Sequence, residues 1–263
     1  MSSRRGKVTY QDIILQKEGG LAKVIINRPP VNVMSLNTVM ELDQALRELS
    51  EDEQVKVILL RGSGDRAFSA GVEVRDHLGE KMPQMLEQFG QLFKTLRGVA
   101  QPVIAVVNGV ALGGGCEVVA GCDLAIASEK AQFGQPEIKL GVNPPPASVL
   151  LPRLLGMKKA LELILTGDSI DASEAERIGL VNKVVPHEEL DQAAEEFAGR
   201  FLNLSRHILK LAKQAIYQVS ELGDFEQALD MINYLSRKIM ESEDAVEGLT
   251  SFLEKRKPQW KNR

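Results

Sequence analysis

The sequence predicts an α/β fold in which parallel strands alternate with crossover helices, followed by a helical C-terminal section. Short apolar segments such as Val55–Leu60 and Pro102–Val107 alternate with stretches of helical spacing in the earlier part of the chain. From His187 onward the pattern is helical almost throughout. A chain of 263 residues can form one large domain with a smaller helical appendage. We therefore expect a core over residues 1–200 and a helical region over residues 201–263.

A local signal supports each element in turn. The pair Gly19–Gly20 separates two apolar runs, Ile13–Gln16 and Leu21–Ile26, and predicts a β-hairpin. Ser35 is a typical N-cap for the helical stripe that follows it. The other expected strands are Val55–Leu60, Pro102–Val107, Leu124–Ala127 and Val181–Val185. The expected helices are Ser35–Leu49, Met82–Leu96, Gly113–Gly121, a helical stretch over Ala147–Gly179, Glu189–Leu202, His207–Leu222, Phe225–Met240 and Ala245–Lys255.

Composition and charge argue against several classes of protein. A net charge of -4 gives no general reason to expect a nucleic-acid partner. No apolar run reaches the roughly 18 residues needed to cross a membrane, and Met1–Asp12 lacks the apolar stretch of a secretory signal. Cys116 and Cys122 are expected to be small buried side chains, because disulfide frameworks and zinc sites need more ligands. We therefore expect a cytoplasmic protein without a metal site.

The glycine-rich stretch Val106–Asp123 carries the strongest chemical signal. Gly113–Gly115 follow an apolar strand and open a helix, where glycine lets the backbone approach a ligand closely. The first N–H groups of a helix have no acceptor within it, so they can bind an anion or an oxygen on which negative charge develops. The stretch lacks the Gly-Lys-Ser/Thr ending of a phosphate loop and the spacing of a dinucleotide fingerprint. An oxyanion-binding site is the better interpretation.

A second glycine turn could supply another donor to the same site. Ala67–Val74 follows the strand Val55–Leu60, and a tight turn at Ala70 and Gly71 would aim the Val72 N–H into a site beyond that strand. Many turns between a strand and a helix contain Ala-Gly, so this motif is weak by itself.

Glu117 lies two residues beyond the glycines, among apolar neighbours. Burial of an ionised carboxylate is costly unless it is paired or protonated, so we expect its pKa to be raised. No Lys or Arg occurs between Val99 and Ser128, so a salt bridge would need a distant partner. The alternative is a glutamate that points to solvent from one face of the helix.

Glu137, within Ala131–Gly141, is a second candidate carboxylate. Alone it is as readily a surface glutamate as a catalytic one. Together with Glu117 it could hold one water molecule, one carboxyl taking a proton while the other supplies a proton to carbon. Asp123 competes for this role but lies on a different face of the helix or beyond its end.

Taken together, these segments resemble the crotonase (enoyl-CoA hydratase/isomerase) superfamily. The resemblance covers roughly residues 10–257. The motifs that carry it are Phe68–Val74, Asn108–Glu117, Ala131–Gly141, Ser173–Val185 and Phe252–Lys257. It implies a spiral of ββα units, with a C-terminal helical region that builds homotrimers and often dimers of trimers.

The same resemblance implies roles for individual residues. Glu117 and Glu137 match the two catalytic glutamates of the hydratases, and the N–H groups of Val72 and Gly114 match the oxyanion hole for the thioester carbonyl. The residues expected to contact substrate or CoA are Ala70, Phe252 and Lys255, the last two reaching the CoA of a neighbouring subunit. The implied activity is hydration of a conjugated enoyl-CoA, with no metal or other cofactor because coenzyme A is part of the substrate.

The sequence departs from the ordinary hydratases in Val142–Leu151. The glycine whose N–H helps to hold the water is matched by Pro145, which has no N–H. His77 and Asp76 could line the pocket or belong to a solvated loop. Gly71–Lys81 together with Pro144–Arg153 resembles the cyclohexa-1,5-diene-1-carboxyl-CoA hydratases of anaerobic aromatic degradation.

Several alternatives stay open from the sequence. One is an ordinary short-chain enoyl-CoA hydratase, and another is an enoyl-CoA isomerase that uses Glu117 and does not need Glu137. Alternatives from other classes are a non-catalytic acyl-CoA-binding or RNA-binding relative and a purely structural α/β protein. The net negative charge and the pair of glutamates count against the binding proteins.

Overall fold

The computed structural model describes residues 9–263, whose strands form a sheet of six and a sheet of four. The strands of the larger sheet are β1 (Ile13–Glu18), β2 (Leu21–Ile26), β3 (Val57–Gly62), β5 (Val103–Val107), β7 (Leu124–Ser128) and β10 (Lys183–Val185). The smaller sheet contains β4 (Ala67–Ser69), β6 (Val110–Leu112), β8 (Gln132–Gly134) and β9 (Ser169–Asp171). Strands pair in parallel except in the β1–β2 hairpin and the β8–β9 pair. The predicted α/β class and the hairpin are confirmed.

The helices connect the strands and continue beyond the last one. The α-helices are α1 (Leu36–Glu51), α2 (Lys81–Gly98), α3 (Gly114–Gly121), α4 (Pro145–Leu155), α5 (Met157–Thr166), α6 (Ala172–Arg177), α7 (Leu190–Leu202), α8 (Arg206–Val219), α9 (Phe225–Met240) and α10 (Glu243–Leu253). Three short 3₁₀ turns occur among the described residues: η1 (Val74–His77), η2 (Pro136–Leu140) and η3 (His187–Glu189). Ser35 caps α1 as expected, accepting a hydrogen bond from the Thr38 N–H at 3.2 Å.

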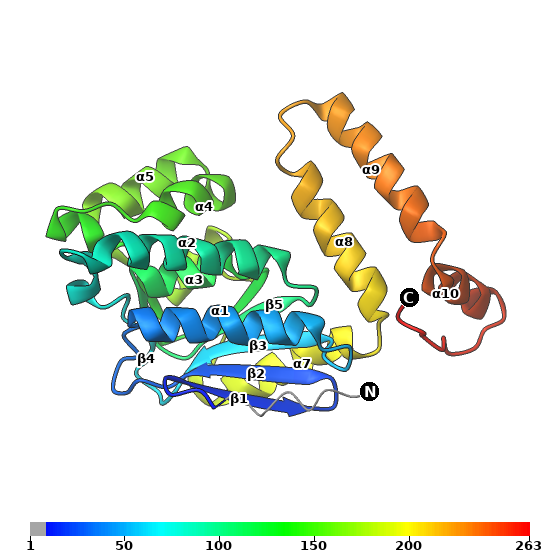
Figure 1. Ribbon diagram of the computed structural model, residues 1–263, viewed down its shortest axis with the longest axis horizontal. Helices are drawn as coiled ribbons and strands as arrows, with labels where there is room; N and C mark the ends of the chain where they lie inside the picture. Colours follow the sequence, from blue (N-terminus) through cyan, green and yellow to red (C-terminus); the bar gives the residue numbers. More distant parts are fainter. Residues whose placement is uncertain (1–8) are drawn as a thin grey trace.

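The larger sheet is covered on both faces, which explains its continuous apolar strands. Side chains alternate between the faces along each strand. In β3, Val57 and Leu59 belong to a cluster with α7, whereas Ile58 and Leu60 belong to the main core with α1 and α2. Figure 1 shows α1 and α2 on one side of this sheet and α7 on the other.

Two predictions about the secondary structure need correction. The helical stretch expected over Ala147–Gly179 is divided into α4, α5 and α6, with β9 between α5 and α6. Glycines with positive φ end the first two helices. Gly156 has φ +78° and ψ +157°, and Gly167, with φ +66°, has the left-handed conformation common after a helix end. The strands of the smaller sheet were not predicted, because three-residue strands are too short to show an alternating pattern.

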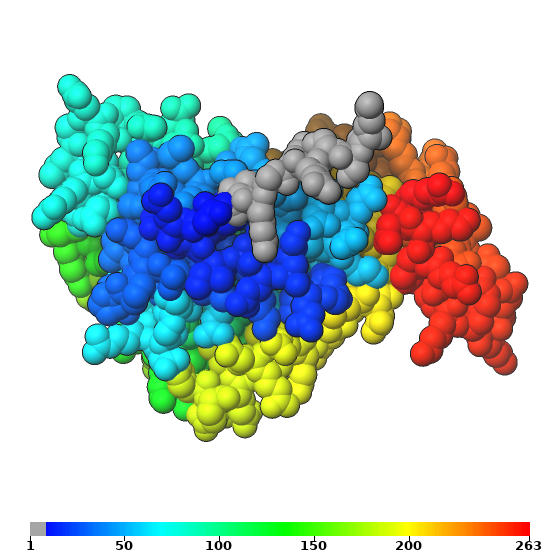
Figure 2. Space-filling view, turned by 60° about the horizontal axis from the view of Figure 1, so that its bottom comes forward, coloured from blue at the N-terminus to red at the C-terminus, as the bar shows by residue number. Residues whose placement is uncertain are grey.

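Helices α8, α9 and α10 project from the sheets. Figures 1 and 2 show them at one end of the molecule, coloured yellow to red. α8 is tied to the core by Lys213, whose Nζ donates to Asp123 Oδ2 at 2.7 Å, and by Tyr217, whose hydroxyl donates to Asp123 Oδ1 at 2.8 Å. Asp123, the sequence competitor of Glu117, therefore has a structural partner. The division at residues 200 and 201 stays a prediction.

α9 has no buried residue, although its spacing is strongly amphipathic. The apolar side chains that it exposes are Phe225, Leu229, Tyr234 and Met240. An apolar helix face of this kind favours packing against another surface.

Candidate active site

Two backbone segments, one around Val72 and the other around Gly114, approach each other where β6 leads into α3. Gly114 is the first residue of α3, so its N–H has no acceptor within the helix. A Cβ atom built on Gly114 would lie only 3.4 Å from the Val72 nitrogen. The close approach of these two backbone segments therefore depends on glycine at position 114.

The direction of the Val72 N–H follows from a single parallel bridge to Met34. The Met34 N–H donates to the Gly71 carbonyl, and the Glu73 N–H donates to the Met34 carbonyl, both at 2.8 Å. Both hydrogen bonds to Met34 are made by the neighbours of Val72, namely Gly71 and Glu73. Because backbone groups alternate in direction along an extended chain, the Val72 N–H points away from Met34. Gly71 has φ +112°, a conformation that favours glycine, and turns the chain at this point.

Glu117 lies in the first turn of α3 and is 2% exposed. Its Oε1 atom accepts a hydrogen bond from the Ala147 N–H at 2.8 Å. Burial raises the pKa of Glu117 to about 8; the Ala147 hydrogen bond opposes this shift and the negative charge of Glu137 adds to it. The expectation of a raised pKa agrees with this environment. The alternative, a glutamate that points to solvent, is wrong because the side chain is buried.

The donor to Glu117 comes from an unusual helix start. Pro144, Pro145 and Pro146 occupy the N-cap and the first two positions of α4, where the N–H groups of other residues would lack an intrahelical acceptor. The first hydrogen bond within the helix runs from the Ser148 N–H to the Pro144 carbonyl at 3.0 Å. Ala147 therefore supplies the one N–H in this first turn that is free for another partner, and Glu117 accepts it.

Glu137 lies in η2, directly after Pro136. Its side chain is partly buried, and its Oε2 atom is enclosed without a hydrogen-bond partner among the described residues. Burial raises the pKa of this carboxyl. A Cβ atom on Gly113 would lie 2.5 Å from Glu137 Oε1, so Glu137 occupies the space that a side chain at position 113 would need. The structure thus brings Glu137 to the glycine run that also contains Gly114.

The other residues expected to line the pocket or to contact substrate differ in how deeply they are buried. Ala70 is partly buried, and its N–H donates to the Val31 carbonyl at 2.9 Å. His77 is partly buried, with Nδ1 at 3.1 Å from the Glu73 carbonyl oxygen. Pro145 is exposed at the start of α4. Their contacts with substrate stay predictions.

Of the two alternatives for Asp76, the solvated loop is wrong because the residue is buried, whereas a place in the pocket wall stays a prediction. The residue is 5% exposed, and its Oδ2 atom accepts a hydrogen bond from the Leu36 N–H at the start of α1, at 2.9 Å. Its Oδ1 atom lies 3.3 Å from Lys81 Nζ. The backbone hydrogen bond and Lys81 hold the pKa of Asp76 below its usual value, although burial opposes them.

Phe252 and Lys255 lie at the other end of the molecule. Phe252 is 81% exposed near the end of α10, and Lys255 follows it with φ +53°. Figure 1 shows α10 on the far side of α8 and α9 from α3 and α4. The structure therefore does not bring these two residues to the glutamates of their own chain, and the expectation that they contact a neighbour's CoA stays a prediction.

Sequence reasoning missed two features of the site. The Ala147 N–H is one of them, and its position as the first non-proline residue after three prolines at a helix start is the signal that could have identified it. Gln135 is fully buried two residues before Glu137, with neither side-chain amide atom hydrogen-bonded among the described residues. A single glutamine carries no comparable signal in the sequence.

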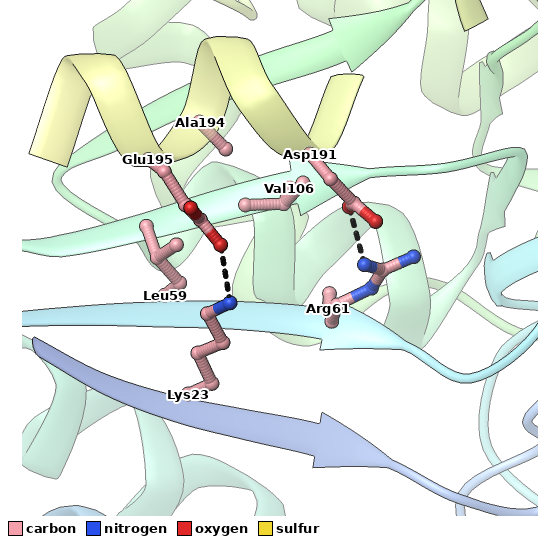
Figure 3. Close-up of a pocket in the computed structure, with 7 residues that line it drawn as sticks. All are labelled: Lys23, Leu59, Arg61, Val106, Asp191, Ala194 and Glu195. Carbon is pink, nitrogen blue, oxygen red and sulfur yellow. Dashed lines mark hydrogen bonds and ion pairs between the residues drawn. The ribbon is translucent and has the colours of Figure 1, made fainter. Parts of the chain in front are cut away.

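A separate hollow lies between the larger sheet and α7 (Figure 3). Its lining residues are Lys23, Leu59, Arg61, Val106, Asp191, Ala194 and Glu195. Lys23 pairs with Glu195 at 2.5 Å, and Arg61 pairs with Asp191, so strand cations and helix carboxylates neutralise each other across the hollow. This arrangement joins α7 to the sheet and offers no unpaired charge to a ligand.

Cys116 and Cys122 are free and buried, as expected from the sequence. Within residues 9–263, no three His, Cys, Asp or Glu side chains are grouped so that they could hold a metal ion. The helices of this part of the chain are also too short or too polar to span a membrane.

The fold and the site together define a family of enzymes. The profile of the enoyl-CoA hydratase/isomerase family matches residues 16–263. The chain is 40% identical over 259 residues to a short-chain-enoyl-CoA hydratase of Clostridium acetobutylicum, covering 96% of this chain and 98% of the relative. It is 39% identical over 255 residues to a crotonyl-CoA hydratase of Syntrophomonas wolfei, covering 95% and 98%.

A solved structure agrees with these sequence relatives. The enoyl-CoA hydratase of Bacillus anthracis superposes with a TM-score of 0.91 at 34% identity, covering 96% of this chain and all of that one. The chain therefore belongs to the enoyl-CoA hydratase/isomerase family. The predicted crotonase-type fold is confirmed, and so is the prediction of an enzyme of the hydratase type.

Proposed function

We propose that this enzyme adds water across the conjugated double bond of an enoyl-CoA, with Glu117 and Glu137 as its catalytic residues. The observation that carries the proposal is that two enclosed carboxyl groups gather at the glycine run that begins α3: Glu137 lies against Gly113 and Glu117 is buried in the first turn of the helix. The Val72 nitrogen lies close to Gly114 in the same run. Burial raises the pKa of both carboxyls, and the charge of Glu137 further raises the pKa of Glu117. The pair can therefore share one proton near neutral pH, leaving one carboxyl to accept a proton and the other to donate one.

The reaction uses these groups as follows. One carboxylate accepts a proton from water while the water oxygen bonds to the β-carbon of the substrate. The electrons of the double bond move toward the thioester carbonyl, where the Val72 and Gly114 N–H groups stabilise the developing enolate oxygen. The other carboxyl group then gives its proton to the α-carbon. The substrate gains one hydroxyl group at the β-carbon and one hydrogen at the α-carbon, which together make one water molecule. The first carboxylate keeps the proton taken from water and the second has lost its own, so the pair still holds one proton. No metal or cofactor beyond the substrate's coenzyme A is needed.

The relatives favour a short linear acyl group as the substrate. The two similar hydratases are named for short-chain enoyl-CoA and for crotonyl-CoA, and both align over nearly their whole length. This supports the ordinary short-chain hydratase, which was the alternative in the sequence analysis. A cyclic dienoyl-CoA is the second candidate, and the observation that favours it is the start of α4 at Pro144, Pro145 and Pro146, which gives the loop beside Glu117 a distinctive rigid form.

Loss of absorbance of the conjugated thioester tests activity and substrate together. Crotonyl-CoA and cyclohexa-1,5-diene-1-carboxyl-CoA are compared with the wild type, Glu117→Gln and Glu137→Gln. Each Gln variant should lower kcat by about 10²–10⁴-fold, the range of general acid–base catalysis. Glu129→Gln removes an exposed carboxylate and serves as the matched control. Folded wild type that hydrates neither thioester, or a Glu137→Gln variant with full activity, would contradict the proposal.

We also propose that the enzyme is a homotrimer or a dimer of trimers in the cytoplasm, with Phe252 and Lys255 near the CoA of a neighbouring subunit. Support comes from the uncovered apolar face of α9 and from the exposed Phe252 at the far end of the molecule. Light scattering should give a mass three or six times the 28.9 kDa of one chain. Phe252→Ala and Lys255→Ala should then raise KM for enoyl-CoA and leave kcat nearly unchanged. A monomeric active enzyme would contradict this arrangement.

A further inference from the structure

The segment that carries the Val72 N–H is attached at several points to the stretch of chain just before α1. Backbone hydrogen bonds join Ala70 to Val31 and join the residues on either side of Val72 to Met34. Beyond Glu73 this backbone pairing stops, and the chain turns through η1 before α2 begins. The end of the segment therefore needs another attachment.

Asp76 supplies that attachment through its side chain. Its carboxylate is buried and accepts the Leu36 N–H, one of the four N–H groups at the start of α1 that have no partner within the helix. The apolar side chains two residues on either side of it, Val74 and Leu78, are 56% and 67% exposed, so these two side chains do little to hold η1 in place. Lys81 pairs with the second oxygen of Asp76 but is itself largely exposed.

We propose that Asp76 is a positioning residue for the oxyanion hole: by binding the Leu36 N–H it holds η1 against α1 and keeps the Val72 N–H aimed at the site beside Gly114. The inference rests on the proposed function, because it assigns to Val72 the role of a carbonyl donor. Asp76 itself touches no reacting atom. It acts through the backbone that runs from η1 by way of Glu73 to Val72. The Asp76 N–H also donates to the Glu73 carbonyl at 3.0 Å, which joins η1 to this backbone.

Two variants of Asp76 and one control variant distinguish a role in positioning the oxyanion hole from a general effect on the stability of the protein. Asp76→Ala removes the acceptor of the Leu36 N–H, whereas Asp76→Asn keeps a side-chain oxygen that can accept it. Ser35→Ala removes another cap of the same helix, because Ser35 Oγ accepts the Thr38 N–H. Ser35→Ala and Asp76→Ala should therefore lower the melting temperature by similar amounts, but only Asp76→Ala should affect the oxyanion hole.

The readout is the polarisation of a bound thioester carbonyl, followed with 4-(dimethylamino)cinnamoyl-CoA. The absorption of this chromophore moves to longer wavelength when donors polarise its carbonyl. We expect a red shift on binding to the wild type, to Asp76→Asn and to Ser35→Ala, and a smaller shift with Asp76→Ala. Loss of a whole oxyanion donor costs about 10²–10³-fold in kcat, so a misplaced donor in Asp76→Ala should cost about tenfold, with KM for crotonyl-CoA changed less than about twofold.

Each outcome supports or overturns a distinct statement. A wild type that binds the chromophore without a red shift would contradict the oxyanion hole and thus the proposed function. A wild-type shift that persists fully in folded Asp76→Ala would overturn the role of Asp76 alone. Equal losses of the shift in Asp76→Ala and Ser35→Ala would assign the effect to the stability of α1 and also overturn the inference. Full rescue by Asp76→Asn, with Ser35→Ala unaffected, is the result that the inference requires.

Discussion

The Oε1 atom of Glu117 accepts a hydrogen bond from the backbone N–H of Ala147, which lies 30 residues later in the chain, at 2.8 Å. This contact joins α3, which carries the glycine run, to the start of α4. Because an N–H donor favours the ionised carboxylate, the bond lowers a pKa that burial raises. The hydrogen bond therefore helps to set the proton-transfer properties of Glu117.

Ala147→Pro should raise the pKa of Glu117 further. Proline is tolerated in the first turn of a helix and would remove only the N–H that Glu117 accepts. The alkaline limb of the pH profile of kcat/KM should then move to higher pH, by about one unit or more. Ala147→Gly retains the N–H and is the control. An unchanged profile in folded Ala147→Pro would show that this bond does not influence the titration.

Glu117→Gln should make the protein more stable at alkaline pH. The pKa of Glu117 in the folded protein, about 8, is above the ordinary value of 4.5, so the folded state binds the proton more tightly than the unfolded state. The contribution of this group is fully present below pH 4.5 and is lost as the pH rises through 8. The free energy of unfolding is measured by urea titration for both proteins at pH 5 and at pH 9. The difference between variant and wild type should shift in favour of the variant by a few kcal/mol, on the order of the pKa shift converted to free energy, from pH 5 to pH 9. An equal difference at the two pH values would be inconsistent with this buried titration.

Gly113→Ala should displace Glu137. The added methyl group would lie 2.5 Å from Glu137 Oε1, and Gly113 has φ +51°, which disfavours alanine. We expect a loss of kcat of at least about tenfold, on the scale of general acid–base catalysis, together with a lower melting temperature. Gly90→Ala, in α2 with no atom within 4 Å of the added Cβ, should be neutral or slightly stabilising. Equal hydration rates in the two variants would contradict this placement of Glu137.

Lys213→Met should loosen α8 from the core. The Lys213 ammonium is buried and donates to Asp123 and to the carbonyls of Leu96 and Gln101. Its removal leaves Asp123 without its cationic partner, a change that typically costs about 3–5 kcal/mol when the pair is buried. Thermal unfolding and limited proteolysis near α8 would detect the change. Lys210→Met, on the same helix, is the control. Equal stability of the two variants would contradict the role of Lys213 in attaching α8 to the core.

The parts of the fold that the sequence predicts are those with long local patterns. The hairpin around Gly19 and the cap at Ser35 depend on neighbouring residues and agree with the structure. The smaller sheet escaped prediction because each of its strands has three residues, and pairing between distant segments stabilises them. The break between α4 and α5 depends on the backbone conformation of Gly156, which a helical apolar pattern does not reveal.

In the candidate site, too, features that depend on sequence neighbours were predictable and contacts between distant residues were not. The burial of Glu117 was expected because its neighbours in sequence are apolar. The Ala147 donor and the cap that Asp76 provides were not expected, because both contacts join residues 30 or more positions apart. The expectation that Glu137 is catalytic depended on the resemblance to a family. The structure adds that this side chain lies against Gly113.

The three prolines before Ala147 also affect the unfolded chain. Each proline restricts its own φ and the conformation of the residue before it, so the unfolded ensemble has fewer states to lose at this loop. A compatible proline typically adds about 0.4–1 kcal/mol in this way. The start of α4 can therefore be ordered before any acyl-CoA arrives. Binding energy from the substrate is then not needed to assemble this wall of the site, and its shape should persist until the whole domain unfolds.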